Sequence, residues 1–194
     1  MRTGTVSAVS AVLLLAAGCG GREDAATPRP TAYPRMEVPP AEYTEAPTPL
    51  HFLVNSRATV TKEETEDDAS QWYTIAYPDY FPGMKIYCTF TSVSPETAAG
   101  VMANRTERMA LNTGGAESEL TTLRSTGGMG CTLMLTRTPV ATPLQFMAAD
   151  SAMVVSGAMY VDLPAGYRPD SIAPMVETVE RDLLETLKSI GNGR

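Results

Sequence analysis

The chain has 194 residues, which is enough for one ordinary domain and a tether. Its 15 lysines and arginines are outnumbered by 22 aspartates and glutamates, so the formal net charge is −7. An acidic surface of this kind argues against a nucleic-acid partner and against electrostatic adhesion to anionic lipid.

The N-terminal residues 1–18 are predicted to be a lipoprotein signal peptide. One positive charge, Arg2, precedes an uncharged apolar run over residues 6–17, which is too short for a permanent membrane span. Ala16-Ala17-Gly18-Cys19 closes the run and resembles a bacterial lipobox, with Ala16 where leucine is usual. We therefore expect cleavage before Cys19 and acylation of its thiol with palmitate-type chains. The alternative is an ordinary secretory signal with a chance cysteine.

Residues 19–50 are predicted to form a lipidated, proline-rich tether, followed by a single domain over residues 51–194. Residues 27–50 contain seven prolines. Proline removes backbone donors and favours extended geometry, so this arm should be semi-rigid and lie outside the sheet. Its apolar residues are Tyr33, Met36, Val38 and Tyr43. They offer contacts either to the domain or to a partner.

The first half of the domain is predicted to contain three strands and a helix. The strands are expected over residues 51–60, 71–77 and 84–91, with an acidic loop between the first two. The third strand alternates with a period of two, and its apolar residues are Met84, Ile86, Cys88 and Phe90. Ser94 and Pro95 predict a helix start, because serine is a good cap and proline fits the first turn. Gly114-Gly115 predicts its end.

The second half is predicted to contain four strands and a longer amphipathic helix. The strands are expected over residues 117–124, 129–137, 144–149 and 153–162, and the last two form a hairpin about Asp150-Ser151. Asp170 or Ser171 is expected to cap the final helix, which runs to about Ile190, with Glu177 and Arg181 as an i,i+4 pair. Its apolar stripe comprises Ile172, Met175, Val176, Val179, Leu183, Leu187 and Ile190.

The order of these elements predicts an α+β fold. Hairpin-type connections dominate, so we expect a mostly antiparallel β-sheet with two helices packed on it. This order resembles the Mog1/PsbP-like architecture, and fold alone does not give function.

Two cysteines, Cys88 and Cys131, remain after lipidation of Cys19. Both fall on apolar faces of predicted strands, which themselves could be neighbours. Outside the cytoplasm such a pair permits one disulfide. The alternative is two buried reduced thiols that behave as small hydrophobic side chains.

The residue types present do not form a pattern that predicts catalysis, a metal site or a cofactor. His51 is the only histidine, and no nucleophile elbow accompanies it. One histidine and two core-facing cysteines make zinc improbable, and the acidic residues of the 61–70 loop lack EF-hand spacing. Five aromatic residues lie close together in the sequence and are interpreted either as a recognition surface or as residues that pack on the sheet. They are Tyr73, Tyr77, Tyr80, Phe81 and Tyr87.

Three segments resemble the gliding-motility lipoprotein family called GldD. The arm from Pro28 to Pro39, followed by Tyr43, has the family's order of Pro-basic-Pro, then Tyr, then Arg-apolar-acidic-apolar-Pro. Residues 72–78 resemble the family's tryptophan-led strand, although Gln71 stands where a cysteine is expected. The C-terminal segments follow in the family's order: Pro143-Leu144-Gln145-Phe146, Asp150-Ser151, Gly157-Ala158-Met159-Tyr160 and Asp170-Ser171-Ile172-Ala173-Pro174.

This resemblance implies a non-enzymatic accessory lipoprotein of the gliding apparatus and the associated type IX secretion system. Its partners would be the membrane, through the lipid anchor, and other gliding or secretion lipoproteins or envelope proteins. The candidate partner-binding residues are Tyr33, Arg35, Gln145, Asp150 and Ser151. The alternative for the last three is a structural role.

The residue that follows the lipidated cysteine indicates to which membrane the protein is sorted. Gly20 rather than an aspartate follows Cys19, which favours the outer membrane facing the periplasm, whereas Glu23-Asp24 points to the cell surface as the alternative. The rival function is a ligand-binding envelope lipoprotein, for which a deep apolar pocket would be needed.

Overall fold

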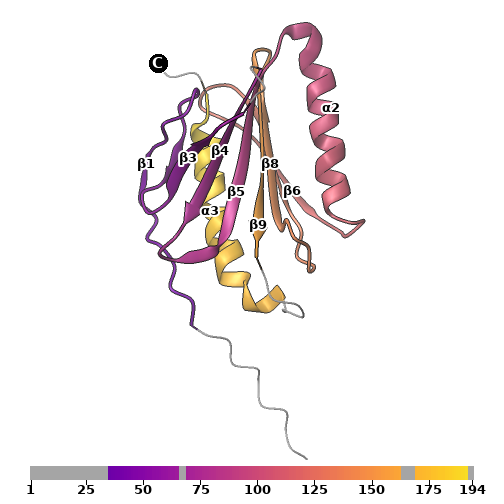
Figure 1. Cartoon of the computed structure of the whole chain (residues 1–194). Coiled ribbons are helices and arrows are strands. Elements are labelled where there is room, and N and C mark those ends of the chain that lie inside the picture. The colour runs from indigo at the N-terminus through magenta and orange to yellow at the C-terminus, as the bar shows by residue number, and fades with distance from the viewer. Residues whose placement is uncertain (1–34, 66–68, 163–168, 192–194) are drawn as a thin grey trace, which may run out of the picture. The chain divides into compact units, whose positions relative to one another are not determined.

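The structure is a computed structural model that describes residues 35–65, 69–162 and 169–191. A seven-stranded sheet runs through this part of the chain, in the order β3-β4-β5-β9-β8-β7-β6, and every neighbouring pair is antiparallel (Figure 1). Its strands are β3 (Thr59–Glu63), β4 (Ser70–Tyr77), β5 (Phe81–Ser92), β6 (Glu119–Arg124), β7 (Gly130–Leu135), β8 (Leu144–Ala149) and β9 (Met153–Val161).

Two helices lie on opposite faces of this sheet, which confirms the α+β prediction. On β8, the Gln145 side chain bonds to a backbone carbonyl of α2 (Pro95–Asn112). On β7, the Cys131 side chain reaches a backbone carbonyl of α3 (Ala173–Ser189). Gln145 pairs with Met134 on β7, and successive residues of a strand point to opposite faces of the sheet. Met134 and Gln145 therefore face away from Cys131, so the two helices contact different faces.

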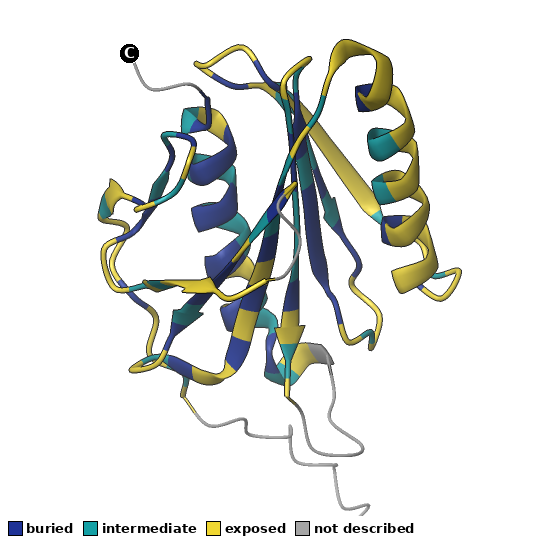
Figure 2. Ribbon diagram, turned by 45° about the horizontal axis from the view of Figure 1, so that its top comes forward, coloured by how far each residue is buried: buried dark blue, intermediate teal, exposed yellow. Residues whose placement is uncertain are grey.

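The inner face, against α3, holds the core. The alternation predicted for β5 is confirmed, because Met84, Ile86, Cys88 and Phe90 are all buried. The predicted stripe of α3 is also confirmed, and its buried members include Met175, Val179, Leu183, Leu187 and Ile190. Figure 2 shows the contrast with α2, which is largely exposed along its length.

The predicted start and end of α2 are both confirmed. The backbone N–H of Ser94 donates to Thr97 Oγ1 at 2.9 Å, and Pro95 occupies the first turn. Gly114 and Gly115 follow the helix with φ of 61° and 83°. Only glycine adopts such left-handed backbone geometry readily, which explains why the helix stops there.

Two predictions about α3 are wrong. Asp170 and Ser171 do not cap it, because they lie in a preceding 3₁₀ turn, η2 (Pro169–Ser171), and Ile172 takes the cap position. Arg181 pairs with the adjacent Asp182 at 2.8 Å rather than with Glu177. The buried carboxylate offers this guanidinium a less solvated partner than the surface glutamate does.

The strand expected over residues 51–60 is two strands. Asn55 ends β2 (Leu53–Asn55), and its side-chain oxygen accepts the N–H of Arg57 at 2.9 Å while its carbonyl accepts the N–H of Ala58. This Asx turn redirects the chain, so β2 leaves the main sheet and pairs with β1 (Tyr43–Glu45).

The folded unit also begins earlier than expected. Strand β1 lies inside the predicted tether, Ala46 and Leu50 are buried, and Met36 packs against the core. The arm from Arg35 onward is therefore part of the domain. Cys19, Tyr33 and the predicted signal peptide lie outside the described residues. Within the described part, no helix is long and apolar enough to cross a membrane.

The C-terminal end of α3 is held at two places. His51 and Gly191 exchange backbone hydrogen bonds of 2.9 and 3.0 Å. A Cβ added at Gly127 would lie 2.3 Å from the Gly191 Cα, so this close approach of two backbones requires glycine.

Candidate functional site

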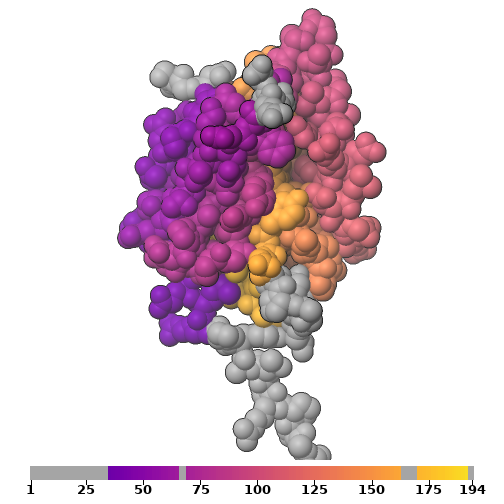
Figure 3. All heavy atoms as spheres, in the orientation of Figure 1, coloured from indigo at the N-terminus to yellow at the C-terminus, as the bar shows by residue number. Residues whose placement is uncertain are grey.

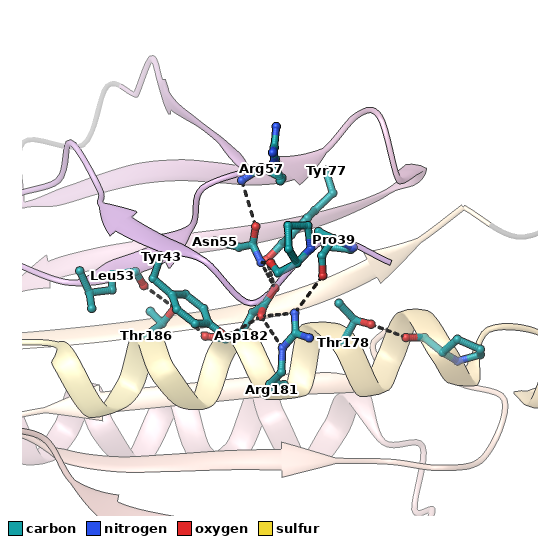
Figure 4. Close-up of polar contacts among 12 residues, drawn as sticks. Pro39, Tyr43, Leu53, Asn55, Arg57, Tyr77, Thr178, Arg181, Asp182 and Thr186 are labelled. Carbon is teal, nitrogen blue, oxygen red and sulfur yellow. Dashed lines mark hydrogen bonds and ion pairs between the residues drawn. The ribbon is translucent and has the colours of Figure 1, made fainter. Parts of the chain in front are cut away.

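A buried carboxylate, Asp182, lies at the centre of the most extensive polar cluster in the described part of the chain (Figure 4). It sits on α3 three residues after Val179, within the apolar stripe, and its side chain is only 3% exposed. A buried aspartate needs partners, because an unpaired charge in the interior is very unfavourable. We call Asp182, Arg181, Tyr43, Asn55 and Tyr77 the Asp182 cluster.

Donors from four elements or connecting segments reach the two oxygens of Asp182. Tyr77 Oη and Asn55 Nδ2 donate to Oδ2 at 2.9 and 3.0 Å. Tyr43 Oη donates to Oδ1 at 2.9 Å. The Arg181 guanidinium adds two bonds to Oδ1, from Nε at 2.9 Å and from Nη2 at 2.8 Å. The carboxylate is therefore well satisfied inside the fold.

The same donors hold the backbone of the arm. Asn55 Nδ2 donates to the carbonyl of Pro40 at 2.8 Å, and Arg181 Nη2 reaches the carbonyl of Pro39 at 3.4 Å. Proline has no N–H, so its carbonyl is the one backbone group that a clamp of this kind can bind. Tyr43, which belongs to the arm itself, completes the connection.

Further hydroxyl groups on α3 hold the neighbouring strand. Thr186 Oγ1 donates to the carbonyl of Leu53 at 2.7 Å, and Ser189 Oγ accepts the N–H of the same residue at 2.8 Å. The backbone of β2 thus has β1 on one side and the side chains of α3 on the other. The arm, the two-stranded ribbon of β1 and β2, and α3 are thus connected by one polar layer.

The electrostatics of the cluster keep its donors protonated. Burial raises the pKa of Tyr77 far above its usual value, and the negative charge of Asp182 and the hydrogen bond to it act in the same direction. Burial and the bond to Asp182 likewise raise the pKa of Tyr43. Burial alone would lower the pKa of Arg181, but its bond to Asp182 and the charge of that carboxylate raise it.

The space beside Asp182 is small. The cavity beside it, lined by Tyr77 and Thr186 among others, has a volume of about 10 Å³. That is roughly the space of one water molecule. The cluster is suited to fixing the arm on the domain.

Gln145, a candidate for partner binding, is used inside the fold. Its side chain is 1% exposed; Nε2 donates to the Met109 carbonyl at 3.1 Å, and Oε1 accepts from Asn112 at 2.9 Å. It connects the C-terminal end of α2 to the sheet. We therefore remove Gln145 from the partner-binding candidates.

Asp150 and Ser151 form the turn between β8 and β9, as predicted. Asp150 Oδ1 accepts the N–H groups of Ala152 and Met153, both at 2.8 Å, and Ser151 is exposed. Arg35 is exposed at the start of the described arm. These residues stay candidates for contact with a partner. Arg35 and the Asp150–Ser151 turn belong to different parts of the fold.

The candidate disulfide between Cys88 and Cys131 is not formed, and both thiols are free and buried. Cys88 lies on β5 and Cys131 on β7, with β9 and β8 between them. Three strand spacings amount to roughly 14 Å. A disulfide needs Cα atoms within about 7 Å. The expectation of neighbouring strands was wrong because β9 and β8 insert into the sheet after the chain has left β5.

The aromatic group is divided between the two faces of the sheet. Tyr73, Tyr77 and Phe81 are buried in the core, as sheet packing predicts, whereas Tyr87 is on the outer face and is 42% exposed. His51 pairs with Glu45 at 3.0 Å near the surface. Among the described residues no group of three or more His, Cys, Asp or Glu side chains could hold a metal ion.

The depressions on the described surface are small or shallow. One at the N-terminal end of α3, lined by Arg137 and Ile172 among others, has a volume of about 150 Å³. Sites for drug-sized ligands usually have about 300–1,000 Å³ and bury most of the ligand. A second depression, lined by Glu119 and Arg137 among others, has about 310 Å³ but is open and lined mostly by polar residues, so neither of these two is the deep apolar pocket that a ligand-binding lipoprotein requires.

The sequence interpretation did not identify the Asp182 cluster. One signal was present, because Asp182 occupies a helix position that the 3.6-residue period assigns to the apolar stripe. Its partners come from residues 43, 55 and 77, and no spacing rule connects these positions to α3.

A comparison with known protein families matches nearly the same residues as the folded domain and its arm. The family model for the gliding motility lipoprotein GldD matches residues 23–191, which include the arm and every member of the Asp182 cluster. No curated protein matches the chain. The chain therefore belongs to the GldD family of gliding motility lipoproteins, which places it at the membrane of the cell envelope with an accessory role in gliding.

Proposed function

We propose that this protein is a non-enzymatic accessory subunit of the gliding and type IX secretion machinery, anchored by acyl chains on Cys19. The observation that carries the proposal is the Asp182 cluster, whose buried carboxylate holds the arm on the domain. A carboxylate engaged in this way is a structural device. This structural use of the carboxylate favours a role as a subunit of an assembly over a role as an enzyme.

The docked arm limits how far the domain can stand from the membrane. Residues 35–50 are part of the folded unit, so only the segment between Cys19 and Arg35 can act as a spacer. Its fifteen residues span at most about 54 Å. A lipid anchor and a short spacer would hold the domain within a defined distance of one leaflet, which suits a subunit of a membrane-bound machine.

The proposed location is the outer membrane facing the periplasm, because Gly20 follows the anchored cysteine. The proposed partners are other gliding or secretion lipoproteins or envelope proteins. Tyr33 and Arg35 near the membrane end of the arm, and the Asp150–Ser151 turn, are the candidate contacts.

Complementation of a gliding bacterium that lacks its own GldD gene tests the proposal. Wild-type protein should incorporate radioactive palmitate, enter the membrane fraction and restore surface spreading and type IX secretion. Cys19→Ala should lose all four properties, since acyl chains supply the membrane attachment. Protease protection in intact cells distinguishes the periplasmic location from the surface.

Crosslinking tests the arm. Changing Tyr33→Ala and Arg35→Ala together should reduce recovery of crosslinked envelope proteins while the thermal transition of the protein stays nearly unchanged. If the double variant recovers every partner, Tyr33 and Arg35 are not contacts with a partner. If the purified protein converts a small molecule and one carboxylate substitution abolishes this conversion, the non-enzymatic proposal is wrong.

A further inference from the structure

Three half-exposed aromatic side chains form a row across the outer face of the sheet. Trp72 on β4 is 46% exposed, and Tyr87 on β5 and Tyr160 on β9 are each 42% exposed. We call these three residues the aromatic row. They represent half of the six large hydrophobic side chains that are exposed in the described part of the chain.

The strand register shows that the row is continuous. Trp72 stands opposite Thr89, Tyr87 opposite Thr74, and Tyr160 opposite Lys85. Each ring is therefore one diagonal step from the next, a separation that aromatic side chains can bridge. The rings of Tyr87 and Tyr160 touch edge to face, with centroids 5.4 Å apart.

Helix α2 leaves this part of the sheet uncovered. It contacts β8 through Met109 and Asn112, packs against β9, and reaches the end of β5 through a bond of 3.4 Å from Arg105 to Thr91, but no such packing on β3 or β4 is found among the described residues. Figure 3 shows the resulting hollow between α2 and the strands β3–β5. At one end of the row lies a shallow depression of about 270 Å³. Its lining residues are Pro82, Gly83, Lys85, Tyr87, Tyr160 and Asp162.

The size of the row argues against a protein partner. An aromatic side chain has roughly 150–250 Å² of surface, so three half-exposed rings offer only about 300 Å². A stable protein interface needs about 800 Å² from each partner. A second copy of the chain or a folded protein would find too little apolar area here, whereas a small ligand needs contact with only one or two of the rings.

The polar groups around the row favour a neutral ligand with paired donors and acceptors. Lys85 supplies a cation and Asp162 an anion at the depression, so neither sign of charge dominates at that end of the row. Glu63, opposite Trp72, adds a carboxylate at the other end. Thr89, opposite Trp72, adds a partly buried hydroxyl group beside the rings, whereas the Thr74 hydroxyl already donates to Glu63 at 2.7 Å. An acetamido group presents one N–H donor and one carbonyl acceptor, which match a carboxylate and an ammonium group.

We propose that the aromatic row, with Lys85 and Asp162, binds an N-acetylated glycan of the cell envelope. The apolar C–H faces of successive pyranose units would pack against Trp72 and against Tyr87 or Tyr160, whose own rings stand at 68° to one another. The acetamido groups would bond to Asp162 and Lys85. This contact is independent of the proposed assembly role and adds a second attachment besides the lipid.

The only tryptophan of the chain lies in the row, so its fluorescence reports on this site. The soluble, full-length Cys19→Ala protein is titrated with chitohexaose, a neutral oligomer of N-acetylglucosamine, and with cellohexaose, which lacks the acetamido groups. We expect a saturable change in Trp72 emission with chitohexaose and at least tenfold weaker binding of cellohexaose.

Matched variants locate the site. Tyr160→Leu keeps apolar bulk but removes a ring, and Lys85→Gln removes the charge; each should weaken chitohexaose binding at least tenfold. Leu120→Ala changes another exposed apolar residue on the same face, 61% exposed on β6, and should bind within twofold of the parent. A thermal transition equal to that of the parent confirms that each variant is folded.

Two results would overturn the inference. A lack of saturable response to chitohexaose up to its solubility limit would show that the row does not bind N-acetylated glycans. Equal binding of cellohexaose would show that the acetamido groups are not recognised. Unchanged binding of chitohexaose by folded Tyr160→Leu would show that the aromatic row is not the binding site.

Discussion

Individual residues of this protein gain their roles from burial more than from their type. Asp182 and Glu185 are both acidic and lie on the same helix, yet Asp182 is 3% exposed and accepts bonds from Tyr43, Asn55, Tyr77 and Arg181, whereas Glu185 pairs with Lys188 near the surface. A surface ion pair contributes little to stability. A buried, hydrogen-bonded carboxylate contributes much more to the local structure.

The Asp182→Ala substitution should lower the free energy of unfolding by about 3–5 kcal/mol, because it leaves buried donors and a half-buried cation without their acceptor. Glu185→Ala on the same helix should change it by less than about 0.5 kcal/mol. Urea denaturation of both variants measures the difference. A loss below about 1 kcal/mol for Asp182→Ala would show that the cluster does not hold the fold together.

Gly157 shows a second role, which depends on close packing in the sheet. A Cβ added there would lie 2.5 Å from the ring of Phe146 and 2.8 Å from the Tyr87 carbonyl, so the glycine leaves room for that ring. Gly157→Ala should therefore destabilise the protein by about 1–3 kcal/mol through overpacking.

Gly100 provides the matched control for that prediction, because no heavy atom lies within 4 Å of a Cβ added at this helical position. Gly100→Ala should stabilise the protein by about 0.5–1 kcal/mol through helix propensity. Thermal unfolding of the two variants should shift in opposite directions. A shift of both in the same direction would contradict the packing explanation.

At the scale of elements, the arm and α3 depend on one another. The ribbon of β1 and β2 does not join the seven-stranded sheet, and its contacts to α3 come from Tyr43, Asn55 and the Leu53 backbone. An isolated two-stranded ribbon is marginal in water. The polar layer on α3, together with the burial of Phe52 and Val54 in the core, therefore accounts for the order of this segment.

Tyr43→Phe removes one donor to Asp182 and should loosen the ribbon more than the sheet. A hydrogen bond to a charged group contributes about 1.5–3 kcal/mol, so protection of the Ala46 and Ser56 amides in hydrogen exchange should fall roughly 10- to 100-fold. Amides of β5 should keep their protection. Tyr160→Phe, on the opposite face, is the control, and an equal loss in both variants would argue against a local connection.

At the scale of the whole molecule, the buried ionisable side chains give stability a dependence on alkaline pH. Burial raises the pKa of the Cys88 thiol to about 12 and also raises the pKa of Cys131. Burial, together with Asp182, raises the pKa values of Tyr77 and Tyr43. All four groups are held in their protonated form by the folded state.

Because these folded-state pKa values exceed the unfolded ones, the unfolded chain loses protons first as pH rises. The contribution of Cys88 is complete below about pH 8.5 and disappears between there and pH 12. The urea midpoint should accordingly fall across this range. In a Cys19→Ala background neither remaining thiol should react with iodoacetamide at about pH 8, since it is the thiolate that reacts. Both should react in denaturant, and rapid native labelling would contradict their burial.

The local elements of this protein follow from its sequence, since their causes are local. The alternation of β5, the Ser94-Pro95 start of α2, the Gly114-Gly115 end and the apolar stripe of α3 each depend on neighbouring residues. The order of strands and helices then suffices for the α+β class. The family resemblance rests on the arm and the C-terminal motifs in the same way, and the family match confirms it.

Only the tertiary structure decides which distant segments meet. The order β5-β9-β8-β7 separates Cys88 from Cys131, and the packing of α2 buries Gln145. Tyr43 and Asp182 meet although 139 residues separate them in the chain. The physical reason is that burial and hydrogen bonding between such residues depend on the packing of whole elements, which no short sequence window contains.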